Sequence, residues 1–164
     1  MSQRPRFIVR AADVPEEEGA YPPPFDGEKL SLGRNLGKAA HTVAMGLWQE
    51  RIPPGRRTSF THAHSHEEEL VYVLAGTCTV RLVYPDGRSE EWPMQGGDVA
   101  SFRAGTGIAH CFRNDGAPGG EDCVLLCVGE RKREVDRAWY PDDPAYDEHR
   151  RTHEPGRSWR PGIK

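Results

Sequence analysis

The 164-residue sequence lacks a long apolar run, a sustained helical period and a large excess of charge of either sign. No stretch approaches the roughly 20 apolar residues of a membrane-spanning helix, and no secretory apolar segment follows the N-terminus. The formal net charge of −3 gives no indication of a clustered basic face for nucleic acid. We therefore expect a soluble, cytoplasmic protein that binds neither membranes nor nucleic acid.

Closely spaced cysteine pairs are also missing. None of the four cysteines belongs to a C-x-x-C pair. Cys123 and Cys127 lie in an apolar, strand-like run, where a reduced thiol packs as a small apolar side chain. We therefore expect reduced cysteines that form no disulfide bonds.

Short strands separated by glycine and proline turns dominate the middle of the sequence. Hydrophobic residues make up only 36% of the chain and are concentrated in short runs. We predict strands over 42–52, 57–63, 68–75, 77–84, 89–93, 98–102, 107–113 and 122–130. No stretch keeps a helical period, and one domain is the default at this length. The pattern predicts an all-β sandwich or barrel.

The two ends of the chain differ in composition from this middle part. Residues 1–38 are rich in proline, glycine and charge, which predicts an irregular arm that packs on the barrel or on a partner subunit. Residues 39–131 form the predicted barrel. Residues 132–164 are charged with isolated aromatics, which predicts a tail anchored near Trp139 and loosely held at its end.

The segment 69–74 is apolar on both of its faces. Its residues alternate between two sets, with Val71 and Val73 on one face and Leu70, Tyr72 and Leu74 on the other. A sheet with one wet face would alternate with polar residues instead. The second face therefore requires a cover, and we expect a homodimer packed through these strands.

Three histidines alternate with small residues over 61–66, directly before a run of three glutamates. In an extended strand, residues two apart share a face, so His62 and His64 can direct their rings toward one point. Neutral imidazole binds divalent transition metals, and a nearby carboxylate completes the ligand set. His110 is a further candidate in a second strand-like stretch, whereas His66 is expected at a turn. The pattern predicts a metal site.

Two motifs, in this order, resemble those of the cupin superfamily. The first places a glycine before H-x-H, a glutamate and another glycine, and it matches Gly55, His62-Ala63-His64, Glu69 and Gly76. The second runs from glycine through P-x-G to histidine and asparagine, and it matches Gly97, Arg103-Ala104-Gly105, His110 and Asn114. Arg103 replaces the usual proline, and extra residues precede His62 and His110. The resemblance covers about residues 40–130.

This resemblance implies a small single-domain cupin, built as a double-stranded β-helix or jelly-roll barrel. It implies that one divalent transition metal per chain is held by His62, His64, Glu69 and His110. Iron, manganese, zinc and nickel all stay open as the metal. Water would occupy the remaining positions, as a catalytic rather than a structural site requires. Some small microbial members of this group are labelled sugar-phosphate-isomerase-like.

Fold does not fix function, so three interpretations stay open. The first is a metal-dependent enzyme acting on a small organic molecule, by dioxygenase-like or Lewis-acid chemistry. Glu69 would then be a stable ligand or a catalytic proton carrier. Strand alternation adds an apolar pocket wall made of Val71, Val73 and Phe112.

The other two interpretations require different ligand contacts. A sugar-phosphate isomerase or epimerase needs cationic groups for the phosphate, and Arg56 and Arg57 are the candidates just upstream of the histidines. A non-catalytic cupin would bind a small molecule tightly without turnover. The metal identity and the presence of turnover would separate the three.

Overall fold

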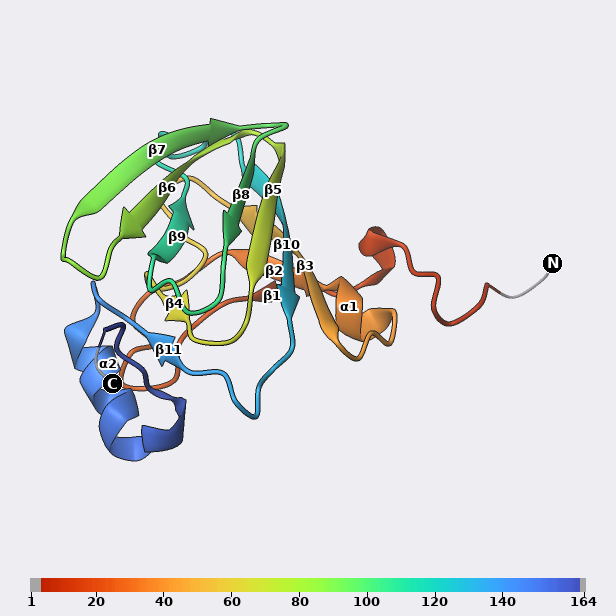
Figure 1. The fold of residues 1–164 in the computed structure, drawn as a ribbon. Coiled ribbons are helices and arrows are strands. Elements are labelled where there is room, and N and C mark those ends of the chain that lie inside the picture. Colours follow the sequence, from red (N-terminus) through yellow and green to blue (C-terminus); the bar gives the residue numbers. More distant parts are fainter. Residues whose placement is uncertain (1–3, 163–164) are drawn as a thin grey trace.

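The computed structural model describes residues 4–162, and its regular secondary structure consists mostly of antiparallel strands (Figure 1). The predicted all-β class is confirmed. In chain order, the strands are β1 (Glu17–Glu18), β2 (Leu32–Asn35), β3 (Met45–Ile52), β4 (Ala63–His64), β5 (Glu69–Ala75), β6 (Thr77–Val83), β7 (Ser89–Gln95), β8 (Val99–Phe102), β9 (Ala109–Arg113), β10 (Cys123–Glu130) and β11 (Ala138–Trp139).

Two main sheets face each other and enclose the core. The six-stranded sheet has the order β1-β2-β3-β10-β5-β8, and the three-stranded sheet has the order β7-β6-β9. A small pair, β11-β4, closes one end of the barrel. Both main sheets contribute the buried cluster of Ile52, Val71, Val73, Cys78, Val80, Met94, Phe112, Cys123 and Leu125. This is the predicted jelly-roll barrel.

The strand β10 lies at the centre of the larger sheet because it pairs with β3 on one side and β5 on the other. Its alternate residues Cys123 and Leu125 have no exposed surface. All four cysteines are free thiols, as the sequence indicates. The hairpin between β6 and β7 is also where the sequence places it, with Gly87 at φ 86° in its turn.

One predicted strand, over 57–63, is mostly absent. This segment crosses from one sheet toward the other and pairs only locally, through the bridges Arg57↔Arg113 and His62↔His110. Regular pairing begins at β4, which contains two residues. The crossing explains how the histidines of this segment reach the barrel interior.

The arm is less irregular than predicted. Its β1 and β2 extend the six-stranded sheet beyond β3, and the short helix α1 (Leu36–Ala39) follows β2. A 3₁₀ turn, η1 (Ala11–Asp13), precedes them. The residues before η1 project away from the barrel (Figure 1).

The expectation of no helix is wrong in the tail. The helix α2 (Pro144–His153) begins with a proline in its first turn, where a missing N–H costs little, and the 3₁₀ turn η2 (Pro155–Arg157) follows it. Only two of its residues, Ala145 and Tyr146, are apolar, too few to produce a helical period. Tyr146 packs with Phe60 and Tyr140 in an aromatic cluster that also includes residues of the arm. The helices of residues 4–162 are all too short or too polar to cross a bilayer.

Candidate metal centre

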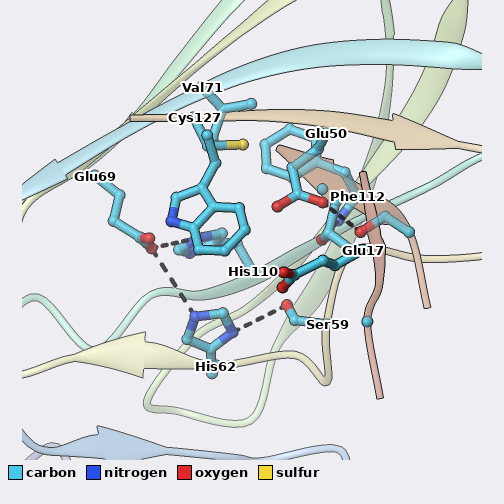
Figure 2. A pocket seen from close by; sticks show the side chains of 14 residues that line it. Glu17, Glu50, Ser59, His62, Glu69, Val71, His110, Phe112 and Cys127 are labelled. Atoms are coloured by element: carbon cyan, nitrogen blue, oxygen red, sulfur yellow. Dashed lines mark hydrogen bonds and ion pairs between the residues drawn. The ribbon is translucent and has the colours of Figure 1, made fainter. Parts of the chain in front are cut away.

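Three histidine rings converge on one carboxylate inside the barrel. The Oε2 atom of Glu69 lies 3.1 Å from Nε2 of His110, 3.6 Å from Nε2 of His64 and 3.9 Å from Nε2 of His62. The four residues predicted as ligands are therefore brought together. Figure 2 shows His62, His110 and Glu69 directed toward one another.

Backbone pairing fixes the positions of these side chains. His62 and His110 exchange hydrogen bonds between their backbones, with N···O distances of 3.1 and 2.8 Å. Glu69 begins β5 and pairs with Gly129 of β10. A Cβ atom at Gly129 would lie 3.4 Å from Cγ of Glu69, an ordinary contact, so the Glu69 side chain packs directly over the β10 backbone. Three separate strand regions thus meet at one point.

The outer ring nitrogens of two histidines have fixed partners. Nδ1 of His62 lies 2.8 Å from the carbonyl oxygen of Phe60, which can only accept, so this nitrogen carries the proton. Nδ1 of His64 donates to Oδ2 of Asp136 at 2.6 Å. In each neutral ring, Nε2 then offers its lone pair to the centre. The ring of His110 is held instead by stacking, 3.5 Å from Phe102 between centroids.

Burial and charge favour the protonation states that a metal requires at His62 and Glu69. Burial lowers the pKa of His62 to about 3, so this ring is neutral at ordinary pH. Burial would raise the pKa of Glu69, but the effects of the nearby His110, with the charges of His64 and His62, outweigh it and lower the pKa. For His64, burial opposes the charged form, but Asp136 and Glu69 raise the pKa overall. The carboxylate is ionised and ready to bind a cation.

The residues fit a divalent transition metal. The buried Oε2 atom of Glu69 has no hydrogen-bond partner among residues 4–162, although an unpaired buried carboxylate oxygen is costly. A cation at the convergence point would satisfy it. Three imidazoles and one carboxylate form a donor set suited to zinc, iron, manganese or nickel.

A second acidic group shares His64 but serves another purpose. His64, Glu67 and Asp136 also lie close enough to hold an ion. However, Oδ1 of Asp136 accepts from the backbone N–H groups of His66 and Glu67, and Glu67 accepts from the backbone of Lys132. These carboxylates are already satisfied, so we interpret the group as the support that orients His64. Asp136 lies in the tail, and no motif in the sequence indicates it.

A cavity of about 330 Å³ opens from the candidate metal centre. Its lining includes His62, Glu69 and His110 at one end, and Val71 and Phe112 from the predicted wall. Val73 does not line it, because this side chain is fully buried in the core. Trp48 and Glu50 are among the lining residues that the sequence does not indicate by a motif, although alternation along β3 places both on the inner face.

The predicted phosphate-binding arginines are engaged elsewhere. Arg56 donates to Glu18, and Arg57 donates to Glu28, so both hold the arm against the barrel. Among the described residues that line the cavity, none is lysine or arginine. The cavity at the metal centre is therefore apolar and acidic.

Comparison with known proteins agrees with this geometry. The cupin domain model matches residues 48–129, which is half of the chain. No curated protein sequence matches the chain significantly. Three solved structures are similar along most of the chain.

The first is a candidate sugar phosphate isomerase from Acidithiobacillus ferrooxidans, 28% identical, with a TM-score of 0.70 over 84% of this chain and 83% of its own. The second is a sugar phosphate isomerase from Silicibacter pomeroyi, 28% identical, with a TM-score of 0.68 over 82% of each chain. The third is a polyketide cyclase from Streptomyces resistomycificus, 26% identical, with a TM-score of 0.59 over 91% of this chain and 94% of its own. The matched domain, the barrel and the convergent ligands agree, and the protein belongs to the cupin family.

Proposed function

We propose that this cupin is a metal-dependent enzyme acting on a small, largely apolar organic molecule. The observation that carries the proposal is the opening of the four-residue centre onto a cavity of about 330 Å³. His62, His64, Glu69 and His110 would hold the metal. When bound, the metal would supply Lewis-acid or oxygen-activating chemistry at this end of the cavity.

The cavity walls support an apolar, flat substrate. Trp48, Val71 and Phe112 line the space beside the ligands, and their apolar surfaces exclude water from the reacting end. A planar molecule would lie between these side chains with one oxygen toward the metal centre. Within this class we propose dioxygenase-like chemistry on an aromatic or diketone-like substrate.

Glu69 is proposed as a permanent ligand rather than a proton carrier. Its Oε2 atom faces the Nε2 atoms of all three histidines, and their charge effects keep its pKa lowered. A carboxylate held in this way is a weak proton acceptor. Proton transfer therefore requires another group in the cavity.

A sugar phosphate isomerase is the second candidate. Two similar structures carry that name, and a separate cavity of about 300 Å³ is lined by Arg133, Arg150 and Arg157 behind His64. Several guanidinium groups beside one cavity suit a phosphate, although Glu67 and Asp136 also line this cavity. The arginines lie on the far side of His64 from the apolar cavity, which favours the first candidate.

Substrate screens on defined metal forms test the proposal. The protein would be reconstituted anaerobically with iron, manganese, nickel or zinc, and each form would be supplied with aromatic, diketone and sugar-phosphate compounds. We expect oxygen uptake and substrate loss with the iron form and an aromatic or diketone compound. Isomerisation of a sugar phosphate, lost in an Arg150→Ala variant, would support the second candidate and contradict the first.

A further inference from the structure

We propose that Glu50 is a catalytic acid–base residue that contacts the substrate across the cavity from the metal centre. The inference rests on the proposed function for the presence of a substrate, and on the structure for the position of the group. The substrate class follows from the two ends of the cavity. It is a planar molecule with one oxygen at the metal centre and a second hydroxyl or carbonyl oxygen at Glu50.

The backbone aims Glu50 into the cavity. Glu50 and Trp48 alternate on the inner face of β3, and both line the cavity. On the adjacent strand β2, Gly33 pairs with Glu50. A Cβ atom at Gly33 would lie 3.0 Å from Oε1 of Glu50 and 3.1 Å from the Trp48 ring. The missing side chain leaves the space that both residues use, as strand glycines often do.

The distance between Glu50 and the metal ligands leaves room for a substrate. Glu50 pairs with Leu125 of β10, and Glu69 pairs with Gly129 of the same strand. Four residues along a strand span roughly 13 Å. Figure 2 shows Glu50 and Glu69 on opposite sides of the cavity. Glu50 is therefore separate from the metal ligands and faces them.

The surroundings of Glu50 differ from those of a structural glutamate. Its single hydrogen bond among residues 4–162 comes from the buried Ser31, whose Oγ donates to Oε2 at 2.5 Å. No cation of the described residues pairs with it, whereas the adjacent Arg51 is paired twice, with Glu16 and Asp122. Glu50 is half-buried, and a half-buried carboxylate without a cation is costly to the fold; such groups concentrate at functional sites.

The groups around Glu50 favour its neutral form. Burial raises its pKa, and the Ser31 hydrogen bond lowers it by less. The titratable groups that share the cavity are Glu17 on β1, Cys127 on β10, Glu69 on β5, His62 before β4 and His110 on β9. None of them is a permanent cation. A carboxyl in such a site can both donate and accept a proton.

The proton transfer balances without any other reactant. Oε2 is occupied by Ser31, so Oε1 is the oxygen free to meet the substrate. In the neutral form, the Glu50 carboxyl donates its proton to a substrate carbonyl oxygen and becomes a carboxylate. In the reverse direction, the carboxylate accepts the proton of a substrate hydroxyl. One O–H bond forms as the other breaks.

Binding of benzoate and its three hydroxylated isomers to the zinc-loaded protein tests the contact without turnover. The carboxylate would lie at the metal end, and one hydroxyl position would reach Glu50. We expect one hydroxybenzoate to bind about tenfold more tightly than benzoate, equivalent to about 1.4 kcal/mol for a hydrogen bond in a buried site. The Glu50→Met variant should lose this preference. The matched Glu17→Met variant, altered at another lining carboxylate, should keep it.

The pH dependence of the same preference separates an acid–base role from a structural one. In the wild-type protein, the preference should change as the Glu50 carboxyl titrates, a transition followed by ¹³C NMR and absent from Glu50→Gln. In Glu50→Gln, which keeps the size and the Ser31 contact, the preference should not vary with pH. If Glu50→Met does not fold, the pH dependence of Glu50→Gln still tests the inference.

Two results would overturn the inference: no hydroxyl preference in the wild type, or a preference that persists in both Glu50 variants. Failure of the proposed function is distinguishable, because absence of turnover with every metal would leave the Glu50-dependent preference intact.

Discussion

The two faces of the six-stranded sheet use the same strands for opposite purposes. On β5, the inner face carries Glu69 at the candidate metal centre and Val73 in the core. The outer face carries Leu70, Tyr72 and Leu74, which are 42, 39 and 43% exposed. The apolar residues on the two faces of β5 therefore lie in different environments. The inner face is enclosed by the barrel, and the outer face is exposed to solvent in the single chain.

Charge separates the two faces as clearly as burial does. Glu50 points inward without a cation, whereas Arg51, the next residue, points outward and pairs with Glu16 and Asp122. Paired charges on the outer face stabilise the surface, while the unpaired carboxylate on the inner face costs stability. The Arg51 ion pairs therefore contribute to folding stability, whereas Glu50 is a candidate for a role in the cavity.

The largest difference in stability is expected between two variants that place an aspartate on the inner or on the outer face of β5. Val73→Asp should destabilise the protein by more than about 4 kcal/mol, because Val73 has no exposed surface and the new carboxylate has no partner. Leu74→Asp should cost less than about 1 kcal/mol in the monomer, because Leu74 is 43% exposed. Urea denaturation followed by circular dichroism would measure both. Equal losses would contradict the distinction between the faces.

The outer face should instead control association. The homodimer expected from the sequence stays a prediction. It is supported by the exposure of Leu70, Tyr72 and Val99, of which Tyr72 and Val99 pair across β5 and β8. The double variant Leu70→Lys/Tyr72→Lys should dimerise about a hundredfold or more weakly than the wild type, because each charge would be buried in the interface. Analytical ultracentrifugation over a wide concentration range would measure this.

Trp92 on β7 provides the matched control for that experiment. It is 57% exposed but lies on the other sheet, so Trp92→Lys should leave the dimer unchanged. A wild-type protein that is monomeric at all concentrations would contradict the prediction.

A smaller effect, on metal affinity, is expected from Asp136, which binds the ring of His64. Asp136→Asn removes the charge that orients His64 through its Nδ1 atom, and metal affinity should fall about 10- to 100-fold. Asp142→Asn is the matched control, because this tail carboxylate binds Arg81 and Thr61 rather than a ligand histidine. Competition with a chelator of known affinity would measure the difference. Identical affinities in the two variants would exclude a special role for Asp136.

The smallest effect is expected where the cavity depends on a missing side chain. Gly33→Ala would press on Glu50 and Trp48 and should cost about 1 kcal/mol through overpacking. Gly46→Ala, on the same inner face, would meet a backbone oxygen at 3.4 Å, an ordinary contact, and should be nearly neutral. Thermal melting and Trp48 fluorescence would show whether the space beside Glu50 is as tight as the structure indicates.

Strand spacing and the two cupin-like motifs were sufficient to predict the barrel and the convergence of the four candidate ligands. Alternation brings His62 and His64 to one face, and the motifs add Glu69 and His110. Asp136 and Glu50 could not be found in this way. Asp136 reaches His64 through the fold of the tail, and Glu50 is distinguished only by what surrounds it.

The other differences between the sequence predictions and the structure also arise from tertiary packing. The helix α2 is stabilised by packing of Tyr146 against Phe60 and Tyr140, not by a period of its own. Likewise, Val73 and Val71 share a face of β5, but one end of that face lies in the core and the other in the cavity. Alternation predicts the face of a side chain, and tertiary packing decides what that face meets.

Metal analysis of two protein preparations tests the central claim most directly. Wild-type protein and the double variant His62→Ala/His110→Ala would be purified anaerobically without chelator and measured by inductively coupled plasma mass spectrometry. We expect about one divalent transition metal per wild-type chain and none in the variant, with unchanged circular dichroism because none of the four ligands belongs to the buried apolar core. A wild-type protein that binds no metal after reconstitution, or a variant that binds as much, would contradict the account.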